Sequence, residues 1–144
     1  MSHFKDTQAY IVLSAELAGC SDARNSERTQ GLRNCLDALP CDYVEARGCY
    51  KGASEVSFVV NISTLRERQG STYYGGLRDV LALADEYGQE SVLLVFYGQA
   101  ALYYLSDDTC EALGKVRAST LTEEEAQDEH DAYTVVGGVV YVTP

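Results

Sequence analysis

Short apolar runs predict the strands of this chain. Residues 9–15 are apolar on both faces, a pattern typical of a central strand. Residues 42–47 alternate between polar and apolar side chains, which suits an edge strand. Residues 56–62 and 91–96 are rich in apolar strand-forming side chains, and a turn then leads to a further strand at residues 101–105.

Two segments between these strands carry the apolar period of a helix instead. Pro40 ends the first predicted helix, and Gly88 is well placed as the C-terminal cap of the second. Their apolar faces recur at i, i+3, i+4 and i+7 and consist of Leu32, Cys35, Leu36 and Leu39, and of Leu77, Val80, Leu81 and Ala84.

The order of these elements is βαββαβ with one added strand. This order is the signature of a ferredoxin-like split βαβ sandwich. We therefore expect an α+β fold with one antiparallel sheet and two helices on one face. Residues 133–136 and 139–142 flank Gly137-Gly138, which predicts an extra hairpin at the C-terminal end.

The 144 residues have the size of one domain, and the formal net charge is −11. We expect a single domain, 1–144, with its core at about 9–105 and an acidic segment and the hairpin in 106–144. The charge disfavours nucleic acid and anionic membranes as partners, because few cations are available to replace counterions. It suits solubility, a cationic small molecule, or imitation of nucleic acid. The six acids of residues 121–131 fit either a solvated helix or loop, or an acidic interaction surface.

Residues for a metal centre or a catalytic triad are scarce. His3 and His130 are the two histidines of the chain, which argues against a zinc site and a Ser-His-Asp triad. The five cysteines form no Cys-x-x-Cys pair, and no signal peptide is recognisable, so we expect reduced thiols in a cytoplasmic protein. No run of residues approaches the length of a membrane-spanning helix. The glycine-rich motifs of nucleotide phosphate sites are absent too.

Residues 48–55 form the most informative stretch of the chain. Glycines bound a predicted turn that carries Tyr50 and ends in Glu55, directly before an apolar strand. Packing explains a carboxylate at this position poorly, whereas a cationic ligand explains it well. The sequence therefore predicts a cation-binding hairpin here.

Three stretches of the chain resemble the bacteriophage S-adenosylmethionine-degrading enzymes, formerly called hydrolases and now understood as lyases. The likeness runs from about Tyr10 to Phe96, and the connection between Tyr50 and Glu55 is shorter here than in the family. The stretches that carry it are Tyr10-Ile11-Val12-Leu13-Ser14-Ala15, Asn25-Ser26-x-Arg28 and Val44-Glu45-x-x-Gly48-Cys49-Tyr50.

The resemblance implies a specific fold, assembly and reaction. The family has a ferredoxin-like, PII-like sandwich and forms homotrimers with active sites between subunits. Its members cleave S-adenosylmethionine to 5′-methylthioadenosine and homoserine lactone, with no water added and no metal or other cofactor. Depletion of the methyl donor blunts host restriction and modification systems, which implies an antirestriction role in the host cytoplasm.

The resemblance also implies roles for seven residues. Glu55 would hold the substrate ammonium or favour the cation. Tyr50 would stack on the substrate or hydrogen-bond it near the sulfonium, since aromatic faces attract cations. The other five, expected to bind the substrate, are Ser14, Ala15, Glu16, Arg28 and Cys49.

Each role has a structural alternative. Glu55 also suits a solvated turn, and Tyr50 suits packing over the hairpin. Arg28 also suits a structural ion pair, because a tight salt bridge would blunt an attacking substrate carboxylate. Ser14 also suits a buried hydroxyl bonded to backbone, and Cys49 suits a small apolar filler without a neighbouring base.

Two other classes of function remain compatible with the sequence. The first is a non-enzymatic antirestriction protein that imitates DNA with its acidic surface. Such a protein needs acids spread at the spacing of phosphates, whereas six of the 22 acids cluster in one late segment. The second is a PII-like trimer that binds a small ligand without converting it.

Overall fold

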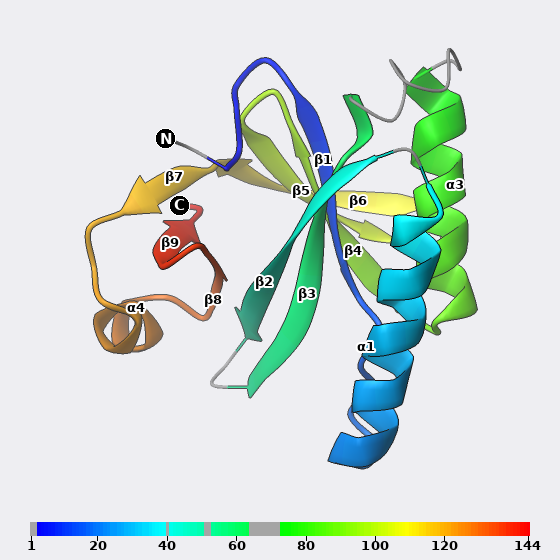
Figure 1. Cartoon of the computed structure of the whole chain (residues 1–144). Coiled ribbons are helices and arrows are strands. Elements are labelled where there is room, and N and C mark those ends of the chain that lie inside the picture. The colour runs from blue at the N-terminus through cyan, green and yellow to red at the C-terminus, as the bar shows by residue number, and fades with distance from the viewer. Residues whose placement is uncertain (1–2, 40, 51–52, 64–72) are drawn as a thin grey trace.

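The computed structural model describes residues 3–39, 41–50, 53–63 and 73–144 (Figure 1). Two long helices stand between the strands of its first two thirds, and short strands dominate the remainder. The elements are β1 (Ala9–Ser14), α1 (Asp22–Asp37), β2 (Asp42–Tyr50), β3 (Ala53–Asn61), α3 (Tyr73–Glu86), β4 (Ser91–Phe96), β5 (Gln99–Tyr104), β6 (Thr109–Lys115), β7 (Arg117–Ser119), α4 (Glu123–Glu129), β8 (Ala132–Val136) and β9 (Val139–Val142).

All nine strands join one antiparallel sheet in the order β6-β5-β4-β1-β3-β2-β8-β9-β7. Its two edge strands, β6 and β7, are consecutive in the chain and are separated by Val116 alone. The backbone N–H of Val116 donates to the carbonyl of Gly98 at 2.9 Å, before β5 begins. The sheet therefore curls until its edges approach each other, and it is nearly closed and barrel-like.

The predicted ferredoxin-like sandwich with two helices is therefore wrong. The sheet has nine strands, and the described residues form three helices. The expected edge strand at residues 42–47 lies inside the sheet, because β2 pairs with β3 on one side and with β8 on the other. The strands β6 and β7 were not predicted, because β6 is largely exposed and β7 has three residues, so neither shows an apolar period.

The outer face of the sheet, which we define as the face that α1 and α3 cover, carries the main core. Ser21 caps α1 by accepting a hydrogen bond from the backbone N–H of Arg24 at 3.1 Å. No helix among the described residues is long and apolar enough to cross a membrane. The largest fully buried side chains in this core are Phe58, Ile11, Leu32, Leu36, Ile62, Val60, Val80 and Val92.

The inner face of the sheet has a core of its own, because successive side chains of a strand point to opposite faces. Phe4 packs edge-to-face against Tyr10 and Tyr141 there, with ring centroids 5.4 and 4.9 Å apart. A third cluster lies on the outer face under α4, where Ala126 is fully buried against β8 and β9. The acidic segment is therefore a short helix that buries one alanine and exposes most of its acids.

Candidate functional site

The site residues gather where β1 ends beside β3. The pairing of these strands stops at Ser14 and Ser57, whereas β2 pairs with β3 as far as Ala53. Beyond Ser14 the sheet therefore has a gap, with one side of β3 open to the chain that follows β1. The predicted turn at residues 48–55 is shorter than expected, because Glu55 is already part of β3; its tip, Lys51-Gly52, lies outside the described residues.

The side chains of Ser14 and Glu16 bridge this gap at Val56 with hydrogen bonds. The Ser14 hydroxyl donates to the carbonyl oxygen of Val56 at 2.7 Å and accepts from the backbone N–H of Glu16 at 3.1 Å. The Glu16 carboxylate accepts a hydrogen bond from the backbone N–H of Val56. Glu16 thus takes the place that a further residue of β1 would occupy in the ladder, and its carboxylate is held at the gap.

Glu55 stands on the inner face beside the same gap. Its cross-strand partner is Gly48, where a Cβ would lie 3.1 Å from the Ser57 hydroxyl oxygen and 3.9 Å from Cγ of Glu55. Partial burial raises the pKa of the Glu55 carboxyl, and the nearby Glu16 carboxylate raises it further, while the Ser14 hydroxyl beside it opposes the rise. The side chain still has an exposed surface through which a ligand can reach it. Two carboxylates, those of Glu16 and Glu55, therefore lie close to each other at this gap.

Arg28 ties the start of this site to the far end of α3. Its Nε donates to the carbonyl of Ala15 at 2.7 Å, and its Nη2 donates to the carbonyl of Tyr87. The guanidinium carbon also lies 5.4 Å from the centre of the Tyr87 ring. Gln89 adds a hydrogen bond from Nε2 to the Glu16 carbonyl at 3.1 Å. The backbone of residues 15 and 16 is therefore fixed from two neighbouring elements.

Tyr50 and Cys49 lie on opposite faces of β2. Tyr50 is 60% exposed and shares the inner face with Gly48, about 7 Å along the strand. Cys49 is buried on the outer face among the residues under α4, and its hydrogen bond with Tyr133 raises the pKa of that tyrosine to about 12. The structure thus brings Ser14, Ala15, Glu16, Arg28 and Glu55 together, leaves Tyr50 at the margin, and separates Cys49 from them.

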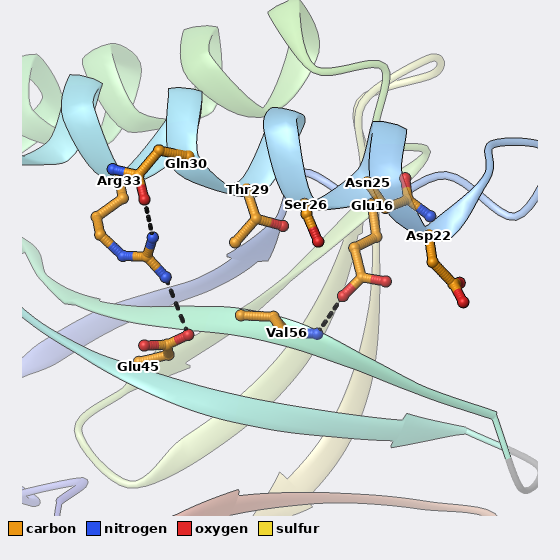
Figure 2. Close-up of a pocket in the computed structure, with 9 residues that line it drawn as sticks. All are labelled: Glu16, Asp22, Asn25, Ser26, Thr29, Gln30, Arg33, Glu45 and Val56. Atoms are coloured by element: carbon orange, nitrogen blue, oxygen red, sulfur yellow. Dashed lines mark hydrogen bonds and ion pairs between the residues drawn. The ribbon is translucent and has the colours of Figure 1, made fainter.

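A cavity of about 470 Å³ adjoins this gap on the outer face, between α1 and the strands β2 and β3 (Figure 2). An ion pair between Arg33 and Glu45, 3.1 Å long, closes one end. Glu16 lines the other end, so the cavity and the Glu55 site share this carboxylate. The lining residues are Glu16, Asp22, Asn25, Ser26, Thr29, Gln30, Arg33, Glu45 and Val56.

Sequence reasoning missed the residues that support this arrangement. Gln89 and Tyr87 follow α3, and they contribute through a side-chain amide and a backbone carbonyl. Asn25 belongs to a recognised stretch, but its pairing with the backbone of Leu17, at 2.9 and 3.1 Å, depends on the turn after β1. The one available signal was that asparagine side chains commonly form hydrogen bonds with backbone groups of nearby turns.

The curled antiparallel sheet thus brings two carboxylates, those of Glu16 and Glu55, together at the end of a buried strand. The comparison with known families specifies the class of protein. The model of the S-adenosylmethionine lyase family matches residues 11–144, and the chain belongs to this family. The resemblance drawn from the sequence is thus confirmed, over a longer stretch than Tyr10 to Phe96. No curated protein matches the chain.

Proposed function

We propose that the protein cleaves S-adenosylmethionine to 5′-methylthioadenosine and homoserine lactone. A substrate carboxylate oxygen forms a bond to the γ-carbon, and the bond from that carbon to sulfur breaks. The electron pair of the broken bond stays on sulfur, so the sulfonium becomes a neutral thioether. The carboxylate becomes the lactone, and no proton, water or co-reactant enters the balance.

The observation that carries this proposal is the pair of carboxylates, Glu16 and Glu55, at the gap beyond β1. A sulfonium is a permanent cation, and it is attracted to Glu55 across the short distance that the open gap allows. Tyr50, on the same face, offers a ring beside it. A site of this kind binds the substrate through its sulfonium, which is the leaving group of the reaction.

The remaining task is to hold the substrate in the conformation that closes the ring. Orientation of reacting groups can supply on the order of 7–11 kcal/mol of a barrier. The attacking carboxylate must stay free of tight ion pairs, because such a pair would weaken it as a nucleophile. Arg28 meets this condition, since its guanidinium bonds the carbonyls of Ala15 and Tyr87.

Direct turnover is the test of this function. We expect purified protein incubated with S-adenosylmethionine to release methylthioadenosine and homoserine lactone in equal amounts, resolved by chromatography. Spontaneous decay of the substrate without protein is the control. Absence of release above that control at high protein concentration would remove the lyase function. Homoserine without lactone at the earliest time points, before added lactone has hydrolysed, would show that water attacks.

We further propose a homotrimer with the sites between subunits, acting in the host cytoplasm against restriction and modification by depleting the methyl donor. Family membership supports this assembly, and so do three exposed apolar or aromatic side chains: Tyr50 at 60%, Tyr97 at 57% and Val44 at 42% exposure. The net charge of −11 supports a function without nucleic acid.

Sedimentation equilibrium tests the assembly. We expect a mass of three chains of 15.7 kDa at micromolar concentration, because a site shared between subunits requires a stable oligomer. A monomer that turns over substrate at the same concentration would contradict an intersubunit site.

A further inference from the structure

The cavity between α1 and the β2–β3 strands contains a buried hydroxyl that no protein group satisfies. Thr29 is 6% exposed, and its Oγ1 has no hydrogen-bond partner within the described residues. Figure 2 shows the side chain pointing from α1 into the space above β3. An unsatisfied buried hydroxyl destabilises the free protein, so its retention in a cavity points to a ligand.

Most other polar groups around the cavity are already engaged. Asn25 bonds the backbone of Leu17 through both ends of its amide. Gln30 donates to Asn34 at 2.9 Å and accepts from Arg33, which also bonds Glu45. These contacts fix the walls of the cavity and remove its one guanidinium from ligand binding.

The groups that remain available differ in kind from those that are engaged. They are the Asp22 carboxylate, the second oxygen of Glu16, and the hydroxyls of Ser26 and Thr29. Carboxylates accept hydrogen bonds only, and a hydroxyl can accept as well as donate. The available set therefore carries two negative charges and four groups that accept, which calls for a cationic ligand with several donors.

We propose that this cavity binds the protonated primary amine of a small ligand, with Glu16 and Asp22 as counter-charges and Thr29 and Ser26 as acceptors. An ammonium group has three N–H donors and one positive charge, which matches the set. Resting on the lyase function, the amine is the α-ammonium of S-adenosylmethionine. Glu16 then lies beside both cations of the substrate, because its carboxylate lines the cavity and also stands near Glu55.

The volume and position of the cavity fit this assignment. About 470 Å³ lies within the range of small-molecule sites and leaves room for the carbon chain that follows the amine. The gap beyond Ser14 connects the two faces at Glu16, whose carboxylate bonds the backbone of Val56 in that gap. A substrate that lies in the gap beside Glu16 can turn its ammonium toward the cavity and its sulfonium toward Glu55, while its nucleoside stays outside the cavity.

Calorimetric titration with three probes tests the proposal without turnover. S-adenosylhomocysteine carries the amine and a neutral thioether that is a poor leaving group, methylthioadenosine has the same nucleoside without the amine, and spermidine is a free amine. We expect Thr29→Val and Asp22→Asn each to weaken S-adenosylhomocysteine binding about tenfold. Their affinity for methylthioadenosine should change less than about twofold.

Two further variants make this comparison specific. Thr29→Ser keeps the hydroxyl and should restore binding of S-adenosylhomocysteine, and Asp128→Asn on the exposed side of α4 removes a charge far from the cavity and should change nothing. Thr29→Val should also raise the melting temperature of the free protein, since it removes an unsatisfied hydroxyl. A hydroxyl kept for a protein contact would give the opposite shift.

The probes separate the sources of the amine. Weakened spermidine binding with unchanged S-adenosylhomocysteine binding would support the amine site and overturn the substrate assignment. Wild-type affinity of both variants for both amines would overturn the proposal. Absence of lyase turnover, together with weaker S-adenosylhomocysteine binding in Thr29→Val and Asp22→Asn, would remove the enzymatic function while leaving this amine site in place.

Discussion

Glu55→Gln is expected to reduce turnover of S-adenosylmethionine by about a hundredfold or more, because it removes the carboxylate that faces the sulfonium while keeping the side chain's shape. The measurement is single-turnover release of methylthioadenosine at saturating substrate, where weaker binding no longer contributes. Glu129→Gln on α4, an exposed and remote carboxylate, is the matched control and should retain full activity. A Glu55→Gln variant that is fully active would show that this carboxylate does not take part.

The same substitution should stabilise the protein at neutral pH. Burial and the Glu16 charge raise the pKa of Glu55 above its ordinary value of 4.5, so the folded state favours the neutral form. The folded state then binds more protons than the unfolded state, and stability falls as pH rises through this window. The melting temperature of Glu55→Gln should therefore exceed that of the parent at pH 7, and the difference should shrink toward zero well below pH 4.5.

Activity should show the opposite dependence on pH. The ionised form of Glu55 exists above its raised pKa, so turnover should decline on acidification earlier than an ordinary carboxyl would cause. A Glu16→Gln variant removes the neighbouring charge and should move this decline to lower pH. An unchanged acidic limb in Glu16→Gln would show that the two carboxylates do not interact.

Local periodicity predicted where several elements lie, but it could not predict how the sheet ends. The apolar runs at residues 9–15 and 91–96 coincide with β1 and β4, because both strands are buried or nearly so. The strands β6 and β7 escaped, since exposed residues carry no apolar period. Their presence changes the architecture, because they are the edges that curl toward each other.

The candidate site could be located from the sequence only in part. Ser14, Ala15 and Glu16 were found because they end a strong apolar strand, and Glu55 was found as a lone acid before another. The two meet because β1 and β3 are antiparallel neighbours, which makes the end of one strand adjoin the start of the other. Thr29 and Asp22 gave no signal, because their importance depends on which groups around the cavity are already bonded.

Cys49 was predicted to lie in a turn, and a turn does not show which face of the sheet a side chain is on. Read as part of a turn, it shared a ligand-binding loop with Tyr50 and Glu55. Strand β2 in fact continues to Tyr50, so alternation places Cys49 on the face opposite Gly48. There it packs with Ala126 and Tyr133, which are the surroundings of a core thiol.

Arg28→Lys is expected to lower the free energy of unfolding by about 2 kcal/mol, because one ammonium cannot bridge the carbonyls of Ala15 and Tyr87 as the forked guanidinium does. The same loss frees the backbone of residues 15 and 16, so the Glu16 carboxylate should be held less firmly. Urea denaturation measures the first effect. The second should appear as a loss of turnover, with the acidic limb of the pH profile moving to lower pH as far as the Glu16 carboxylate moves away from Glu55.

Binding of S-adenosylhomocysteine to single and double variants shows whether Arg28 positions the backbone or binds the substrate carboxylate. If Arg28 only positions the backbone of Ala15 and Glu16, Arg28→Lys should weaken S-adenosylhomocysteine binding only by disturbing the amine site. Adding Thr29→Val to Arg28→Lys should then weaken binding little further. A residue that binds the substrate carboxylate directly would make the two losses additive, because each substitution would remove a separate contact. Additive losses of binding free energy would therefore mean that Arg28 binds the substrate. Overlapping losses would mean that Arg28 only holds the backbone and leaves the attacking carboxylate free of an ion pair.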